Sequence, residues 1–449
     1  MDFTETICTL STPAGTGAIG LIRISGKKSL EILQSVFVSK SNKTLFEPNK
    51  VYMGTIIDKN EIIDEVLITY FKQPNSYTGE NLIEISCHGS VYIQRSILEL
   101  LVSKGCRLAE PGEFTLRAFM NGKIDLSQAE AISDLIASQS KAAHQLAIQH
   151  LKGGFSSKIK SLRKQLLHFT ALLELELDFA EEDVEFANRI EIKHLFEKLK
   201  QEIQSLLHSF KMGNVFKNGI PVAIAGKPNV GKSTLLNTLL NEERAIVTNI
   251  PGTTRDTIED TIVIDGFMFR FIDTAGLRTT SDEIEKYGIE RSYKAMEKAT
   301  IILYLIDKDE VDNKEVKKIK EKFKEKKLFV LVNKSDLLPE FPTTSTKDTF
   351  YISAKKKINI SAINDALKEF VATLESPNDI LVANTRHYEA LYNAHLSLLQ
   401  AEEAFDKQVP TDLVMVDIKQ VLYYLGTITG EIHNNEILES IFKNFCIGK

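Results

Sequence analysis

The pattern of hydrophobic and polar positions predicts a mixed α/β fold for residues 1–120. Two short runs, Ala18–Gly26 and Leu82–Gly89, are rich in β-branched residues and bounded by glycine, as strands are. The next run, Ser90–Gly105, repeats its apolar residues at intervals of three and four positions and ends on glycine. This spacing predicts a helix that ends at Gly105.

From Leu126 onwards the apolar period is helical over a long stretch. One stripe of apolar residues predicts a helix that is buried on one side. Its members are Ile159, Leu162, Leu166, Phe169 and Leu173. The acidic stretch Glu174–Phe186 predicts a solvated helix end rather than a metal site, because no histidine lies near it in the sequence. Glycine and asparagine interrupt the helical period at Lys211–Gly219, which predicts a linker there.

Strands and helices alternate after this linker until Ser376–Asp379 interrupts the pattern again. From Ile380 the chain is helical, with a stop predicted at Gly426 and one more helix after it. The apolar positions of these last helices are Leu413, Val416, Val421, Leu422, Ile437, Ile441 and Phe445. Each helical stretch alone would expose its apolar stripe. We therefore expect the two stretches to pack together as one helical domain that is interrupted by an α/β insertion.

The composition is that of a globular protein and limits the classes of function. A chain of 449 residues suggests roughly three domains of about 150 residues each. The net charge of −6 argues against a surface that binds nucleic acid everywhere, although a local basic patch is compatible with it. The four cysteines form no C-x-x-C pair, so neither a zinc knuckle nor a disulfide framework is predicted. Since no long apolar run and no signal peptide are recognisable, we expect a cytoplasmic protein without membrane contact.

One glycine-bearing loop carries the strongest chemical signal. The run Ile220–Asn237 has the pattern of a buried strand, a loop and the start of a helix, and it matches G-x-x-x-x-G-K-S from Gly226. Backbone amides of such a loop hold phosphate oxygens at a helix N-terminus. Gly231 lets the backbone approach closely, Lys232 reaches the β- and γ-phosphates, and Ser233 is suited to ligate Mg²⁺. The alternative, a merely glycine-rich turn, is disfavoured by the strand before the loop and the helix after it.

Further motifs follow in the order that a GTPase needs. Thr254, in the run PGTTRD, can close over Mg²⁺ and the γ-phosphate, and Phe269–Gly276 is a strand that ends in D-x-x-G. Asp336, in the N-K-x-D run, can accept from guanine N1–H and the 2-amino group together, a donor pair that adenine lacks. A loop at Ser353–Lys355 can support the base. All of these motifs in order predict a Ras-like GTP-binding domain over residues 216–378.

The motifs leave open which residue orients the attacking water. Ras-like proteins place glutamine directly after D-x-x-G, whereas this chain has Leu277. Glu283, Glu285 and Glu290 lie just downstream, where a mobile loop could bring one of them in. The alternative is that all three glutamates are charged residues on the solvent-exposed face of a helix.

Over essentially its whole length, the chain resembles the MnmE (TrmE) family of tRNA modification GTPases. The resemblance rests on "TPAGTGAIGLIRISG", "SYTGENLIEISCHGS" and "EPGEFTLRAFMNGKIDLSQAEAI", on "GKPNVGKS", "PGTTRD" and "DTAGLR", and on the terminal "FCIGK". The nucleotide-binding motifs are shared with many GTPases, whereas the N-terminal strings and the tail are specific. Two small departures are Ala18, where glycine is more usual, and Thr427, where an acidic residue is expected.

The resemblance implies a multidomain α/β protein. An N-terminal α/β folate-binding-like domain, residues 1–119, would form a constitutive homodimer. A discontinuous α-helical domain would follow, residues 120–215 and 379–449, and would end in the Cys-Ile-Gly-Lys tail. A Ras-like P-loop GTPase domain, residues 216–378, would be inserted between its two parts.

The motifs and the resemblance together name the candidate site residues. The candidate GTP-binding residues are Asn229, Val230, Gly231, Lys232, Ser233, Thr248, Asn249, Ile250, Pro251, Gly252, Thr253, Thr254, Asp273, Thr274, Ala275, Gly276, Asn333, Lys334, Asp336, Ser353, Ala354 and Lys355. Ser233 and Thr254 are the Mg²⁺ candidates. The resemblance alone implies K⁺ contacts at Asn229, Thr248, Ile250 and Thr253. It also implies contacts to 5-formyl-tetrahydrofolate, or a related one-carbon folate, at Arg23, Glu80, Lys123 and Lys449. Glu285 matches the family's water-positioning acid.

The resemblance also implies a partner and a reaction. With MnmG, which carries FAD and NADH chemistry, the family modifies the wobble uridine of certain tRNAs at C5. The product is carboxymethylaminomethyluridine or the aminomethyl form. GTP hydrolysis would act as a conformational switch in a heterotetramer with MnmG and would not supply a reactant.

Cys446, near the end of the chain, has two open interpretations. A lipid-anchor signal is disfavoured because Gly448 is not aliphatic, Lys449 is a poor terminal residue, and no basic run precedes them. The thiol could pack as a small hydrophobic group. Alternatively it could lie near the folate or the target uridine, where a thiolate can add to pyrimidine C6 and activate C5.

Two other classes of function are less consistent with the sequence. An RNA-binding or ribosome-assembly GTPase would need an appended RNA-binding module, and the sequence after Glu375 shows only helices. A helical scaffold with a vestigial nucleotide site is disfavoured because each nucleotide-contacting motif is intact.

Overall fold

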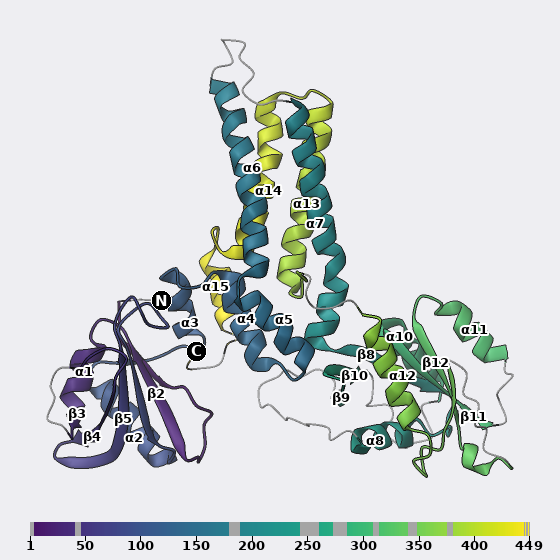
Figure 1. Cartoon of the computed structure of the whole chain (residues 1–449), viewed down its shortest axis with the longest axis horizontal. Coiled ribbons are helices and arrows are strands. Elements are labelled where there is room, and N and C mark those ends of the chain that lie inside the picture. The colour runs from purple at the N-terminus through teal and green to yellow at the C-terminus, as the bar shows by residue number, and fades with distance from the viewer. Residues whose placement is uncertain are drawn as a thin grey trace. The chain divides into compact units, whose positions relative to one another are not determined.

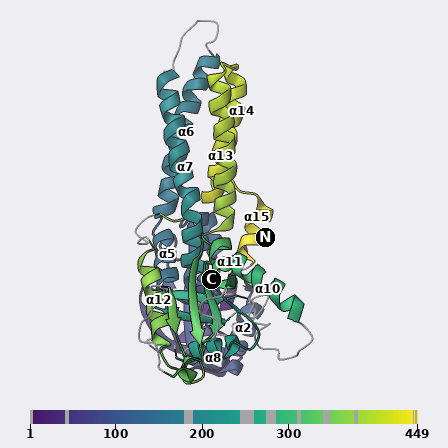
Figure 2. The ribbon, with the colours of Figure 1, turned by 90° about the vertical axis from the view of Figure 1, so that its right-hand side faces the viewer.

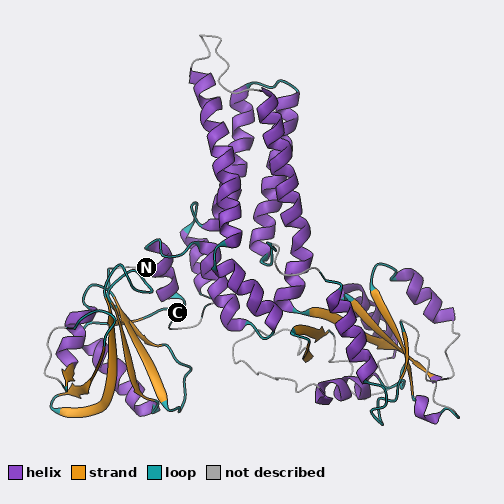
Figure 3. Cartoon of the chain, in the orientation of Figure 1, coloured by secondary structure: helices purple, strands orange, loops and turns teal. Residues whose placement is uncertain are grey.

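The computed structural model describes residues 4–40, 46–178, 189–242, 260–272, 285–308, 314–339, 348–374, 380–443, 445 and 448. The chain divides into two compact units, and Figure 1 shows their helices and strands coloured by residue number. The first unit consists of Met1–Ser133, His150–His194 and Leu396–Lys449, and the second of Asp134–Gln149 and Leu195–His395. Each unit contains one sheet (Figure 3).

The first unit begins with a 7-stranded sheet of order β3-β4-β5-β6-β2-β1-β7. The strands are β1 (Ile7–Leu10), β2 (Ile19–Ser25), β3 (Phe37–Ser39), β4 (Val51–Asp58), β5 (Glu61–Phe71), β6 (Leu82–His88) and β7 (Arg107–Leu108). Neighbouring strands are antiparallel, except that β1 and β7 are parallel. The two strands predicted from the sequence are therefore confirmed as β2 and β6.

Two helices, α1 (Ser29–Val36) and α2 (Val91–Ser103), share a hydrophobic core with this sheet. Ile22 and Ile24 of β2 alternate with more exposed residues, as expected for a strand with one buried face. The predicted helix stop is also confirmed, because Gly105 takes a left-handed φ of 101° two residues after α2 ends.

The helices that follow in the first unit pair segments that are far apart in sequence. They are α3 (Glu113–Met120), α4 (Leu126–Ala137), α6 (Gly154–Asp178), α14 (Thr411–Thr429) and α15 (Asn435–Phe442). Helix α6 packs against α14, and Figure 2 gives a second view of this pair. Of the predicted stripe on α6, Ile159, Leu162, Leu166 and Leu173 are at most 1% exposed, whereas Phe169 is only partly buried.

The stop predicted at Gly426 is wrong. Helix α14 continues to Thr429 and ends at Gly430, which has a left-handed φ of 80°. Gly426 is instead a close-packing position, since a Cβ there would lie 2.9 Å from Ile432 Cδ1. The last predicted helix is also shorter than expected, because α15 ends before Phe445.

The second unit contains a 6-stranded sheet of order β13-β12-β11-β8-β10-β9. The strands are β8 (Ile220–Gly226), β9 (Asp260–Ile264), β10 (Phe267–Phe271), β11 (Ile301–Asp307), β12 (Lys327–Asn333) and β13 (Thr349–Tyr351). Neighbouring strands are parallel, except that β9 is antiparallel to β10.

Helices pack on this sheet through two separate hydrophobic cores, as in a doubly wound α/β fold. One core includes residues of α8 (Lys232–Glu242) and α12 (Ser361–Ala372). The other includes residues of α10 (Glu285–Lys298) and α11 (Lys314–Lys322). The loops that follow β8 and β12 lie at the carboxyl edge of the sheet, where ligands of such folds bind.

The linker predicted at Lys211–Gly219 is wrong as well. Helix α7 (Arg189–Asn218) runs through it, and only Gly219 separates α7 from β8. Gly213 lies inside α7, where it allows the backbone of Val382 to pack closely against the helix. A Cβ at position 213 would lie 2.1 Å from the Val382 carbonyl oxygen. In the second unit, α7 also stacks Phe210 on Tyr388 of α13 (Thr385–Asp406), with ring centroids 4.4 Å apart, and contacts α5 (Lys141–Leu151) through Phe216.

Candidate functional site

The loop between β8 and α8 is shaped for the close approach of a phosphate. Gly226 and Gly231 have left-handed φ angles of 142° and 99°. A Cβ would lie 2.2 Å from the Leu305 carbonyl oxygen at the first position and 2.3 Å from Asn333 Nδ2 at the second. Both positions therefore require glycine. The amides that open α8 face the loop, as phosphate binding at a helix N-terminus needs.

Lys232 and Ser233 open α8 with their polar groups at the loop. Lys232 Nζ donates to the carbonyl oxygens of Gly226 and Lys227, both at 2.8 Å. Burial lowers the pKa of Lys232. The Ser233 side chain is exposed, so its hydroxyl is open to a ligand.

Asn333 joins the phosphate loop to the two loops predicted to hold the base. Its Nδ2 donates to the Val230 carbonyl oxygen at 2.7 Å, and its Oδ1 accepts from the Ala354 amide at 3.0 Å. Thr238 of α8 adds a hydrogen bond to the Ala354 carbonyl oxygen at 3.0 Å. The structure therefore brings together the predicted residues of β8–α8, β12 and Ser353–Lys355.

Asp336 and Lys334 lie just after β12. Lys334 Nζ contacts Asp307 Oδ2 at 2.6 Å. The carboxylate of Asp336 lies 3.1 Å from Lys356 Nζ, and hydrogen bonds from Ser353 and Lys356 lower the pKa of Asp336. The carboxylate is therefore held in its ionised form, the form that accepts two donors from one base edge.

Several predicted site residues lie outside the residues that the structure describes. They are Thr248, Asn249, Ile250, Pro251, Gly252, Thr253, Thr254, Asp273, Thr274, Ala275, Gly276, Cys446 and Lys449. Glu285 opens α10, but its side chain also lies outside the described part.

Arg23, Glu80 and Lys123 are all placed at one end of the first unit's sheet. Arg23 of β2 pairs with Glu84 on the neighbouring strand β6, with Nε 2.9 Å from Oε1, and its guanidinium lies 5.6 Å from the centre of the Tyr77 ring. Glu80 accepts from Ser25, which shares a face of β2 with Arg23. Lys123 Nζ donates to the Pro74 carbonyl oxygen at 3.0 Å.

Part of the chain's last segment lies against the same region. Arg23 and the Ser11 hydroxyl both donate to the Gly448 carbonyl oxygen, each at 3.2 Å. Phe445 is buried with Leu116 of α3 in the hydrophobic cluster that also includes α15. The described residues of the tail are thus anchored beside a predicted folate residue.

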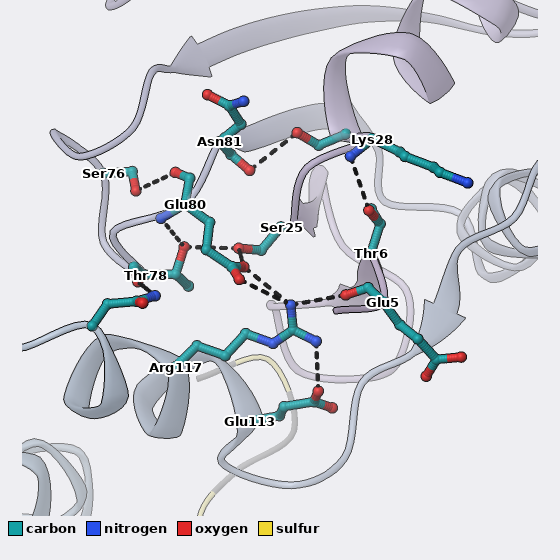
Figure 4. Close-up of polar contacts among 12 residues, drawn as sticks. Glu5, Thr6, Ser25, Lys28, Ser76, Thr78, Glu80, Asn81, Glu113 and Arg117 are labelled. Atoms are coloured by element: carbon teal, nitrogen blue, oxygen red, sulfur yellow. Dashed lines mark hydrogen bonds and ion pairs between the residues drawn. The ribbon is translucent and has the colours of Figure 1, made fainter. Parts of the chain in front are cut away.

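Sequence reasoning missed a polar network behind Glu80 (Figure 4). Glu80 accepts from Ser25 Oγ at 2.8 Å and from the Arg117 guanidinium at 3.0 Å, and Arg117 also donates to Glu113 at 2.9 Å. Thr78 Oγ1 lies 2.7 Å from Ser25 Oγ. The signal that could have found it was a Glu–Arg pair four residues apart in an otherwise largely apolar helix.

We expect the ionised Glu113 to make stability depend on acid pH. Burial by itself raises the pKa of Glu113, but hydrogen bonds from Arg107, the Glu110 amide and Arg117 outweigh it, so the pKa lies below its ordinary value of 4.5. The stability that this ion contributes is therefore complete above about pH 4.5 and is lost as the pH falls through the folded-state value.

Unfolding of the wild type and Glu113→Gln between about pH 3 and pH 6 measures this effect. The difference in unfolding free energy between them should narrow as the pH falls. Glu110→Gln, an exposed acid one turn away, is the matched control and should show no such trend. A difference between wild type and Glu113→Gln that stays constant with pH would contradict the expectation.

Comparisons with known proteins bear on these sites. A family model described as the GTP-binding protein TrmE N-terminus matches residues 6–123, and one described as the MnmE helical domain matches residues 126–446. The tRNA modification GTPase MnmE of Flavobacterium psychrophilum is 50% identical over 462 residues, covering 100% of both chains. The chain belongs to the MnmE family of tRNA modification GTPases. The MnmE of Cytophaga hutchinsonii is 49% identical over 453 residues, covering 99% of this chain and 98% of that one.

MnmE membership confirms the predicted family, and the two matched MnmE models fit the predicted multidomain α/β fold. Among solved structures, Era in complex with MgGDPNP and a fragment of 16S ribosomal RNA is 26% identical over 39% of this chain and 65% of that chain. Its TM-score of 0.25 is too low to support an argument.

Two features are absent from the part of the chain that the structure describes. No helix among the described residues is both long and apolar enough to cross a membrane. In the same part of the chain, no group of three or more His, Cys, Asp or Glu side chains is arranged to hold a metal ion.

Proposed function

We propose that this GTP hydrolase acts with MnmG, a FAD-dependent partner, to add a carboxymethylaminomethyl or aminomethyl group at C5 of the wobble uridine of certain tRNAs. The observation that carries the proposal is the 50% identity to a tRNA modification GTPase over 100% of both chains. The match includes the N-terminal and helical parts as well as the nucleotide-binding unit. An RNA or ribosome-assembly GTPase is the other candidate, and the two matching family models, described as the TrmE N-terminus and the MnmE helical domain, favour the tRNA modification hypothesis over it.

The nucleotide-binding residues have separate roles in this proposal. The loop amides and Lys232 hold the β- and γ-phosphates, and Asp336 accepts from the guanine edge, with Asn333 fixing the distance between the two loops. Glu285 orients the attacking water.

Two cations would complete the nucleotide site. Ser233 fits a magnesium ligand because its exposed hydroxyl lies at the start of α8 beside Lys232, and Thr254 would be the second ligand. The residues proposed to hold K⁺ are Asn229, Thr248, Ile250 and Thr253. Such cations supply positive charge beside the β- and γ-phosphates, where negative charge develops.

The one-carbon donor would be 5-formyl-tetrahydrofolate or a related folate bound to the N-terminal part. Arg23, Glu80, Lys123 and Lys449 would contact it. Support comes from the close placement of Arg23, Glu80 and the anchored tail. The proposed contacts include the positive charges of Arg23, Lys123 and Lys449 and the carboxylate of Glu80. Such a set suits a ligand that carries both carboxylates and ring N–H groups.

Cys446 would act as a nucleophile near this site. The Gly448 carbonyl, two residues further on, is held by Ser11 and Arg23, which supports a tail position beside the folate.

The protein would form a cytoplasmic homodimer that joins MnmG in a heterotetramer. The GTP cycle would open and close the nucleotide-binding domains and so change the folate–tRNA site.

Mass spectrometry of tRNA nucleosides from cells lacking this protein tests the function. We expect loss of the C5-modified wobble uridines and their return with the intact gene. A Cys446→Ser variant made at normal level should fail to restore them if the thiol is chemical, and should restore them if it only packs. An unchanged nucleoside profile in the deletion would overturn the proposal in favour of an RNA-assembly role.

A further inference from the structure

A chain of alternating charges runs through the N-terminal part and ends at Glu80. Its members, in order, are Glu5, Arg107, Glu113, Arg117 and Glu80. The successive nitrogen–oxygen distances are 2.6, 2.6, 2.9 and 3.0 Å. Figure 4 shows its inner end, where Arg117 lies between Glu113 and Glu80.

The inner pair is fully buried. The Arg117 side chain is 1% exposed and Glu113 is 0% exposed. Removing two such ions from water carries a large desolvation penalty, so a well-packed apolar pair is often as stable or more stable. A contribution to folding stability is therefore not sufficient to explain an ion pair between Arg117 and Glu113.

What an apolar pair would lack is the contact to Glu80. Arg117 directs the NH₂ group at Nη1 to both carboxylate oxygens of Glu80, at 3.0 and 3.3 Å, and to the Glu5 carbonyl oxygen at 2.9 Å. Its other NH₂ group is held by Glu113. The planar guanidinium is thus fixed from two sides, and Ser25 adds a second donor to Glu80 at 2.8 Å. About a fifth of Glu80 stays open, since its side chain is 20% exposed.

We propose that Arg117, with Ser25, is a positioning residue of the folate site: it fixes the orientation of the Glu80 carboxylate so that the open part of that group meets the ligand. This inference rests on the proposed folate function of Glu80. It assigns the buried pair of α3 to ligand binding. A lysine at position 117 would keep the charge but would lose the fork that reaches Glu80, Glu113 and the Glu5 carbonyl together.

Arg117→Lys and Arg107→Lys are a matched pair of variants. Both make the same chemical change in the same charge chain, but Arg107 contacts Glu5 and Glu113 and does not contact Glu80 in the described structure. Binding of 5-formyl-tetrahydrofolate to the full-length protein is measured by titration calorimetry, with thermal unfolding and GTP binding as checks on folding. We expect Arg117→Lys to weaken folate binding about tenfold or more and Arg107→Lys to change it less than about threefold.

The double variant Glu80→Gln with Arg117→Lys separates positioning from general damage. If Arg117 acts through Glu80, the second substitution adds no further loss to Glu80→Gln. Ser25→Ala keeps the test open if Arg117→Lys does not fold, because it removes only a hydroxyl donor and should also give no added loss beside Glu80→Gln. Equal effects of Arg117→Lys and Arg107→Lys, or fully additive losses in the double variants, would overturn the inference. A wild type that binds no folate would instead refute the proposed folate site itself.

Discussion

Replacing Lys232 with alanine is expected to lower the rate of GTP hydrolysis by a factor of about 100 or more. Lys232 is the ammonium at the start of α8, held in the loop by the Gly226 and Lys227 carbonyl oxygens. It is the cation that the loop can direct at the β- and γ-phosphates, where the transition state gains negative charge. Single-turnover hydrolysis with saturating GTP measures the effect on chemistry apart from the effect on affinity.

Lys227→Ala is the matched control for this prediction. Lys227 belongs to the same loop, but its side chain is 43% exposed and lies 3.6 Å from Glu315. We expect its hydrolysis rate to stay within about threefold of the wild type. Near wild-type hydrolysis in a folded Lys232→Ala protein would show that the loop does not serve the chemistry.

The second large effect is expected at Asp336, which should set the choice of base. Asp336→Asn removes one acceptor and adds an amide donor, so the guanine 2-amino group meets a donor instead of an acceptor. Because the variant can no longer accept the hydrogen bond from the guanine 2-amino group, its GTP affinity should fall about 100-fold or more. Xanthine carries an oxygen at that position, so the same variant should gain affinity for XTP. Competition between GTP and XTP for one fluorescent nucleotide measures both changes.

Asp348→Asn makes the same substitution at an acid that pairs with Lys327 and is 46% exposed. It should leave the ratio of GTP to XTP affinity unchanged. If Asp336→Asn binds GTP as tightly as the wild type, or gains nothing for XTP, the base is recognised elsewhere.

The glycine-bearing loop between β8 and α8 was predictable from the sequence because its requirements are local. Gly231 and Lys232 stand at fixed offsets in one loop, and backbone geometry at that loop leaves little choice of residue. Strands such as β2 and β6 were predictable for a similar reason, since a buried face with period two is visible in the sequence.

What escaped prediction depends on contacts between distant segments. Gly213 and Gly426 look like helix breaks, but each makes room for a neighbouring segment, Val382 in one case and Ile432 in the other. Arg117 is similar: its partner Glu80 lies 37 residues earlier, and no periodicity reveals that pairing. The role of a glycine or a charged residue in a helix therefore depends on its tertiary neighbour, which the local sequence does not identify.

The pairing of α6 with α14 sets an order of events during protein synthesis. Helix α6 ends at Asp178 and α14 begins at Thr411, so more than 230 residues leave the ribosome between them. At about 5–20 residues per second, this interval lasts about 10–50 s. Leu162 and Leu166, fully buried in the finished unit, have no α14 to cover them during that time. The nascent chain therefore carries an uncovered apolar stripe while the whole second sheet is being made, and a chain cut short after that sheet would keep the stripe exposed and tend to aggregate.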